Sequence, residues 1–322
     1  MLQVSRHTFK SDTSTEVMVR TQVDFTPTRI DYGGEFHVIS GTQGEVCILR
    51  RDGSRIEGSG AIPFPAPVVD GVVLGTRWIG VWRDRDFQTS CMASLPLEKR
   101  LLDGPSRDSL RLSAERSRGI TPANSIWSKE LDSEPMKIGI SGGNVVFATY
   151  SGIFMIDINA DLIWVSPLPS WPPIYNLRHF DAVASINEFP LGIAIWSQAG
   201  GVSVLDPSNG IELHNSVVSL KNKISNVYFS EEGGWLIILD GNSVAELADW
   251  GANPKIHKTL GPVMEAKFVD GRWLWTGWRH DGELLNGEVK SYPREEIGVG
   301  ILDGFVLLNN GCWDHWGQSS LT

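Results

Sequence analysis

The sequence MKIGISGGNVVFATYSGIFMIDINADLIW, residues Met136–Trp164, decides the fold because it shows one structural unit more clearly than any other stretch. Short runs rich in Val, Ile, Phe and Trp alternate with turns made of Gly, Asn and Asp, which is the pattern of antiparallel strands joined by hairpins. The predicted strands are Lys137–Ser141, Val145–Tyr150, Ile153–Asp157 and Leu162–Trp164. One such sheet cannot bury both of its faces, so we expect neighbouring sheets of the same kind.

Copies of this unit recur along the chain. Turns at equivalent places lie about 33 to 50 residues apart, except where one long segment intervenes, and such periods with about four strands each are typical of β-propeller blades. The sequence therefore predicts an all-β fold in which the 322 residues form a single β-propeller domain of seven blades. Six or eight blades, or a pair of β-sandwiches, are the alternatives. The predicted turns contain Gly34, Gly71, Gly143, Gly192, Gly234, Gly271 and Gly304.

The two ends of the chain predict how the ring closes. Alternating polar segments, Gln3–Lys10 and Glu16–Gln22, precede the first unit, and the last unit, Ile297–Trp316, lacks an outer strand. A ring in which the N- and C-terminal strands pair within one blade produces this mismatch. We therefore expect closure by pairing of the terminal strands.

Two stretches carry a family resemblance. GIFMIDINADLIW, residues Gly152–Trp164, and GGVSVLDPSNGIEL, residues Gly200–Leu213, combine a Gly turn, an apolar strand ending in Asp, and a second turn. This pattern resembles the repeats of PQQ-like and WD40-like propellers, and the resemblance implies their fold. The Gly-His and Trp-Asp pairs of a WD40 repeat and the vicinal Cys pair of a quinoprotein dehydrogenase are absent from the sequence. The resemblance therefore implies no enzyme activity and no cofactor.

Charge and composition narrow the classes of partner. The formal net charge is −10, from 28 Lys and Arg against 38 Asp and Glu, which argues against binding to nucleic acid or to an anionic membrane. The N-terminal sequence has no apolar signal region, and no apolar run approaches the length of about 18 residues that spans a bilayer. Three scattered cysteines do not form a disulfide framework. These features predict a cytoplasmic protein.

One segment departs from the repeat. Glu98–Ala123 is rich in Arg and Ser, shows little periodicity, and interrupts the second unit before its predicted outer strand, Asn124–Leu131. We expect an irregular surface loop, which is either a tolerated insertion or a docking segment for an acidic partner. Its basic candidates for partner contact are Arg107, Arg111, Arg116 and Arg118.

Predicted turns supply the other candidates. Arg83 and Arg85 alternate with Asp in one turn, and Trp278, Arg279 and His280 follow one another in another. Exposed ion pairs of this kind contribute about 0–1 kcal/mol, so they indicate a site only if they converge in space. The tryptophans of the strands have two interpretations, an aromatic binding face or packing between blades, and we favour packing because large aromatic side chains dominate cores. They are Trp78, Trp82, Trp196, Trp235, Trp273 and Trp275.

Recognisable catalytic chemistry is missing from the sequence. Its seven histidines form no H-x-H or H-x-x-x-H pair, and C-x-x-C, G-x-S-x-G and P-loop motifs are absent, so we predict no metal site. We expect a non-enzymatic platform for a protein partner, present as a monomeric propeller within a complex. The alternatives are an enzyme with carboxylates or histidines gathered at the central channel, and an accessory subunit of an ATPase-linked assembly.

Overall fold

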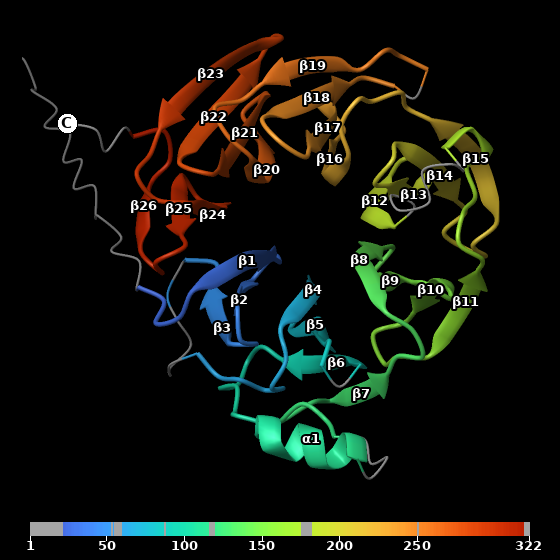
Figure 1. Ribbon diagram of the computed structural model, residues 1–322, viewed down its shortest axis with the longest axis vertical. Helices are drawn as coiled ribbons and strands as arrows, with labels where there is room; N and C mark the ends of the chain where they lie inside the picture. The colour runs from blue at the N-terminus through green and yellow to red at the C-terminus, as the bar shows by residue number, and fades with distance from the viewer. Residues whose placement is uncertain are drawn as a thin grey trace, which may run out of the picture.

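The computed structural model describes residues 22–52, 54, 60–86, 88–115, 120–174, 182–249 and 251–318. Seven antiparallel sheets stand around a central axis, so the protein is an all-β seven-bladed β-propeller (Figure 1). The strands of each sheet follow one another in sequence order, and the first strand of every sheet faces the central opening. This confirms the blade count predicted from the spacing of the turns.

The first four blades run from the N-terminal side. They comprise β1 (Pro27–Tyr32), β2 (Phe36–Gly41) and β3 (Val46–Arg50); β4 (Val68–Leu74), β5 (Arg77–Asp84), β6 (Thr89–Pro96) and β7 (Trp127–Glu130); β8 (Pro135–Ser141), β9 (Asn144–Thr149), β10 (Gly152–Ile156) and β11 (Leu162–Ser166); β12 (Val183–Phe189), β13 (Gly192–Ser197), β14 (Gly201–Leu205) and β15 (Glu212–Val217).

The last three blades complete the ring. They comprise β16 (Ile224–Ser230), β17 (Gly234–Leu239), β18 (Ser243–Leu247) and β19 (Lys255–Lys258); β20 (Val263–Val269), β21 (Arg272–Gly277), β22 (His280–Leu285) and β23 (Glu288–Pro293); β24 (Gly298–Leu302), β25 (Phe305–Leu308) and β26 (Trp313–His315).

Apolar side chains of adjacent blades form the core. The rings of Trp78 and Trp82 meet edge to face at 5.3 Å within a cluster that joins the first two blades. Trp196 and Trp235 lie 5.4 Å apart between the fourth and fifth blades. These side chains are buried, as are those of Trp273 and Trp275, so packing between blades is confirmed as their role.

One predicted turn is wrong. Gly71 lies inside β4, and the chain turns at Gly75, whose φ is +58°. Gly71 is needed for close approach, because a Cβ there would overlap Oδ2 of Asp31 and the indole of Trp78. A glycine in a strand interior often marks such a close approach.

The segment predicted to be irregular contains a helix, α1 (Arg107–Glu115), between β6 and β7 on the outside of the second blade (Figure 1). The Oγ of Ser106 accepts a hydrogen bond from the backbone N–H of Ser109 at 3.1 Å, which caps the helix. Leu110 is 1% exposed and packs into the core cluster of the first two blades. Within residues 107–112, whose side chains are described, Leu110 is the one buried apolar residue, and this gives too weak a periodicity to predict a helix from sequence.

The described residues join the ends of the ring by a few contacts. The backbone N–H of Val23 donates to the carbonyl of Gly311 at 2.8 Å, and that of Ile301 donates to the hydroxyl of Tyr32 at 3.1 Å. The first and last blades each hold three of the named strands. The segments predicted to close the ring, Gln3–Lys10 and Glu16–Gln22, lie outside the described residues apart from Gln22.

Candidate functional site

All seven innermost strands share one irregularity. Each strand shifts its register against its neighbour within its first three residues, which is the mark of a β-bulge. Bulges re-aim the side chain beside them and are common next to functional sites. The residue that follows the shift therefore occupies an equivalent place in every blade, and we call these seven residues the bulge ring. They are Arg29, Asp70, Lys137, Ser185, Asn226, Glu265 and Gly300.

The bulge ring surrounds a cavity of about 570 Å³ in the central channel. Its six members that carry a side chain line this cavity, together with Asp31, Asn187, Tyr228 and Lys267 from the same strands. The seventh member must be small, because a Cβ on Gly300 would meet the side chain of Ile30 and lie 2.9 Å from Oε2 of Glu265. A cavity of this volume with several polar side chains in its lining is suited to a small ligand.

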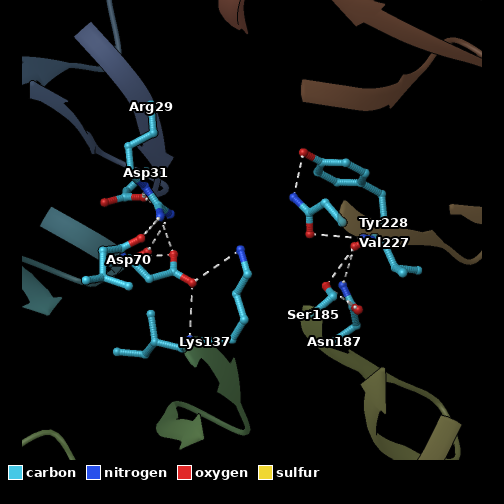
Figure 2. A network of polar contacts seen from close by, with 12 residues as sticks. Arg29, Asp31, Asp70, Lys137, Ser185, Asn187, Val227 and Tyr228 are labelled. Carbon is cyan, nitrogen blue, oxygen red and sulfur yellow. Dashed lines mark hydrogen bonds and ion pairs between the residues drawn. The ribbon is translucent and has the colours of Figure 1, made fainter. Parts of the chain in front are cut away.

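Arg29 holds one side of the channel together (Figure 2). Its Nε donates to Oδ1 of Asp31 at 2.7 Å, and its Nη1 forms an ion pair with Asp70. The guanidinium also reaches the carbonyls of Val69 and Gly71, at 3.4 and 3.3 Å. One arginine thus bridges the first and second blades and satisfies two buried carboxylates.

The two carboxylates differ in their proton affinity. Burial raises the pKa of Asp31 to about 6, although Arg29 and the Trp78 indole, which donates at 2.7 Å, favour the charged form. Burial acts on Asp70 too, but the positive charges of Arg29 and Lys137 hold its pKa below the ordinary value. Two carboxylates that share one arginine separate in this way because the second negative charge is less well compensated.

The opposite side of the channel carries neutral polar groups from β12 and β16 (Figure 2). The hydroxyl of Ser185 lies 2.9 Å from Oδ1 of Asn187 and 3.0 Å from the carbonyl of Val227, to which Nδ2 of Asn187 donates at 3.1 Å. Nδ2 of Asn226 donates to the hydroxyl of Tyr228 at 3.0 Å. The channel is therefore charged on one side and neutral on the other.

Glu265 is the third carboxylate of the channel. Burial raises its pKa to about 7, while Lys267 and a hydrogen bond from Tyr32 favour the charged form. Nζ of Lys267 lies 3.1 Å from the centroid of the Tyr32 ring, a cation–π contact. Carboxylates do gather at the channel, but Asp31, Asp70 and Glu265 each have a basic partner. The described residues contain no group of three side chains arranged to bind a metal ion.

A second hollow, of about 750 Å³, lies on one end face of the ring, and we call it the rim pocket. It brings together three of the arginines predicted from sequence, Arg83, Arg85 and Arg107. Nη1 of Arg107 lies 2.5 Å from Oδ2 of the buried Asp84, and Nη2 lies 2.6 Å from Oδ2 of the exposed Asp86. These two ion pairs hold the start of α1 against the turn between β5 and β6. The remaining charged or polar lining comes from Thr42, Gln43, Glu134, Tyr150 and Gln198.

Arg85 differs from the other two arginines of the rim pocket. Arg83 forms an ion pair with Glu134, whereas Arg85 has no ion pair within the described ranges. Partial burial and the neighbouring positive charge of Arg85 lower the pKa of Arg83. Two guanidinium groups of like charge at one hollow favour an anionic group between them.

The other predicted contact residues do not join this pocket. Trp278, which is 54% exposed, and Arg279 lie in the turn between β21 and β22. This turn is equivalent to that between β5 and β6, so it lies on the same end face but in the sixth blade. His280 is fully buried and hydrogen-bonds the carbonyl of Trp278, which makes it a structural residue. Arg111 is exposed on α1, and Arg116 and Arg118 lie outside the described residues.

Sequence reasoning missed the bulge ring. Each innermost strand begins with an apolar or small residue, a variable residue, and then the ring member, as in PTR, VVD, PMK, VAS, ISN and VME. Aligning the seven strand starts reveals a column that is polar in six blades. A single strand shows nothing unusual, because one polar residue in an alternating pattern is expected on a wet face.

Comparison with known proteins agrees with this architecture. No family model and no curated protein matches the sequence. Among solved structures, the β-propeller domain of Cps50 (Swd1) from Myceliophteria thermophila superimposes with a TM-score of 0.61 at 9% identity, covering 94% of this chain and 99% of that one. YCF48 bound to D1 peptide gives 0.58 at 11% identity, covering 94% and 96%. BamB from Moraxella catarrhalis gives 0.54 at 11% identity, covering 92% and 86%.

These likenesses define the class of the protein. The chain is a seven-bladed β-propeller that resembles PQQ-like and WD40 propellers, as the repeat pattern predicted. At such low identities the likeness shows the fold alone. Among the described residues, no helix has the length and apolar character needed to cross a bilayer.

Proposed function

We propose that the protein is a binding platform for another protein, and that an acidic segment of the partner docks in the rim pocket. The observation that carries this proposal is the convergence of Arg83 and Arg85, at the end of β5, with Arg107, at the start of α1, on one hollow of an end face. Loops held by a rigid scaffold are the usual place of recognition, and the rim pocket is built from such loops.

The charges of the pocket suit a partner that brings carboxylates. Arg85 has a free guanidinium within the described residues, and Arg107 is 51% exposed although it is paired. A partner carboxylate can bind Arg85 in a bidentate manner and compete with Asp86 for Arg107. The structural neighbours support binding of this kind, since one of them, YCF48, is solved with a bound peptide.

The proposal is tested by capturing partners with the tagged full chain from a lysate of the source cells and quantifying them by mass spectrometry. Arg85→Glu is compared with Lys258→Glu, which reverses an exposed charge on β19 of the fifth blade. We expect one acidic partner to be lost with Arg85→Glu, kept with Lys258→Glu, and weakened by added salt. Equal recovery by both variants, or no partner at all, contradicts the proposal.

A second candidate function is an enzyme whose site is the central channel. Glu265 favours it, because a carboxyl group with a pKa of about 7 is suited to donate and accept protons near neutral pH. Turnover of a small molecule that is abolished by Glu265→Gln, with the fold intact, would support the enzyme. Retained turnover in that variant excludes Glu265 as its acid or base.

We also propose that strands from both chain ends close the ring, and that the platform works in the cytoplasm as one subunit of a complex. The hydrogen bond from Val23 to Gly311 supports the closure, because it brings the start of the described chain to the turn between β25 and β26. Deleting residues 1–21 is then expected to lower the melting temperature by several degrees. An unchanged melting temperature contradicts closure by these segments, and microscopy of a tagged chain tests the location.

A further inference from the structure

We propose that the central channel binds a small carboxylate-bearing molecule, held by Lys137 on one side and by Asn187 and Tyr228 on the other. This site shares no lining residue with the rim pocket and does not depend on the partner proposed for it. The acceptors of the channel already have hydrogen-bond partners, whereas several of its donors do not.

Lys137 forms an ion pair with Asp70, but its N–H groups make no hydrogen bond with any described residue. Its ammonium group can donate three hydrogen bonds. Its charged neighbour is Asp70, whose Oδ2 lies 3.7 Å away, beyond hydrogen-bond distance. Within the described ranges Nζ has no hydrogen bond, and the side chain is 27% exposed. The ammonium is therefore free to donate to a ligand.

Neutral donors face it from β12 and β16 (Figure 2). One N–H of Asn187 is engaged with the carbonyl of Val227, which leaves the second N–H of the amide. The hydroxyl of Tyr228 accepts hydrogen bonds from Asn226 and from the backbone of Ala266, so its own O–H is left to donate. Both side chains line the cavity.

The acceptors of the channel, in contrast, are occupied. Asp31 binds Arg29 and Trp78, and Asp70 accepts from Arg29 and from backbone N–H groups. Glu265 accepts from Tyr32 and lies beside Lys267. What remains is a set of N–H and O–H donors, one of which is the ammonium group of Lys137. A ligand must therefore supply negatively charged acceptors, which favours a carboxylate over a cation or an uncharged molecule.

The size of the channel sets the size of the ligand. The cavity of about 570 Å³ is enclosed by the seven innermost strands and lies within the range of small-molecule sites, about 300–1,000 Å³. A carboxylate can come from a free small acid or from the C-terminus of a partner chain. We assign the site to the free acid, because the volume of the cavity is that of a small-molecule site.

The test is isothermal titration of the full chain with acetate, succinate, citrate and glutamate, with inorganic phosphate and sulfate as competing anions. We expect at least one carboxylate to bind with a dissociation constant below 1 mM, about 10-fold or more weakly to Lys137→Met, and unchanged to Lys258→Met, the matched loss of an exposed lysine. Binding of phosphate and sulfate alone overturns the assignment to carboxylates.

A second variant and a peptide pair complete the test. Tyr228→Phe removes one hydroxyl, keeps the ring, and is expected to weaken binding several-fold, so the proposal stays falsifiable if Lys137→Met fails to fold. A short peptide is titrated with a free and with an amidated C-terminus. Binding of the free peptide acid without any small acid overturns the assignment to a free molecule. No binding by any carboxylate, or equal binding to wild type and both channel variants, overturns the site.

Discussion

The central channel and the rim pocket are both lined by arginines and carboxylates, but they are built in opposite ways. The channel takes one residue from the same position of every blade, and its charges are buried and paired across blades. The rim pocket takes its arginines from one turn and from an insertion present in the second blade. Repetition thus builds a rigid polar ring, whereas a local departure from the repeat builds an exposed and adaptable surface.

The largest difference is expected when one arginine is removed from each site. Arg29→Met leaves Asp31 and Asp70, whose side chains are 1% and 7% exposed, without their shared cation. Loss of one partner of a buried ion pair costs about 3–5 kcal/mol of folding free energy. Arg107→Met removes a half-exposed cation and leaves one buried carboxylate, Asp84, which still accepts from the backbone N–H of Asp86, so it is expected to cost less, about 1–3 kcal/mol. Urea denaturation measures both losses, and equal losses would contradict this difference between the two sites.

Leu110 holds α1 against the core of the first two blades. Leu110→Ala removes the contact of α1 with the core of the first two blades and is expected to cost about 2–5 kcal/mol in docking of the helix. Hydrogen exchange across residues 107–112 should rise while the innermost strands stay protected. Leu112→Ala, at a side chain that is 42% exposed, is the control and should change little. Exchange that rises in the channel as well would show that the two sites are coupled.

The bulge ring predicts a smaller effect at its glycine. Gly300→Ala places a methyl group against Ile30 and Glu265, so we expect a loss of about 1–3 kcal/mol from overpacking. Gly34→Ala is the control, since a Cβ there meets nothing within 4 Å. Thermal unfolding of the two variants compares them. Equal melting temperatures would mean that the ring tolerates a seventh side chain.

Glu265→Gln is expected to change the stability least at neutral pH. Its effect lies in how steeply the stability falls as the pH rises. Burial raises the pKa of Glu265 to about 7, above the ordinary value of about 4.5, so the folded state binds its proton more tightly than the unfolded state. The contribution of Glu265 to stability is therefore present below about pH 4.5 and is lost as the pH rises to about 7. The variant should lose less stability than wild type over this interval.

Several charged groups surround Glu265 and must be considered in that experiment. Lys267 lies on its own strand, Arg29, Asp31 and Tyr32 face it from β1, and Tyr228 lies on β16. Asp31 is expected to act in the same direction, because burial raises its pKa to about 6. Melting curves of wild type and variant from pH 5 to 8 measure the difference. Parallel curves would show that Glu265 is charged throughout.

The sequence predicted the blades better than the sites, for physical reasons. Glycine turns between apolar strands are local signals, so the seven units and the packing role of Trp78 and Trp196 followed directly. The turn at Gly71 was wrong because its glycine serves a contact with Asp31, a residue of the neighbouring blade. Contacts across blades leave no local trace in the sequence.

The same distinction explains the candidate sites. Arg83 and Arg85 were found because charged residues stand out in a turn, and Arg107 because it lies in a segment that breaks the repeat. Lys137 and Glu265 were missed, since one polar residue in a strand is ordinary until seven strands are superimposed. The pairing of Arg29 with Asp70 joins two blades and depends on register, which the turns alone do not define.

The recurring bulge also makes the channel separable from the scaffold. In each blade the register shift sets the backbone conformation at the bulge-ring position. The residue at that position sets the chemistry that the blade presents to the channel. A residue at this position can therefore change the chemistry of the channel without changing the strand register, although charged members such as Arg29 must change together with their partners. The ligand specificity of the channel can therefore change while the strand pairing of the blades stays the same.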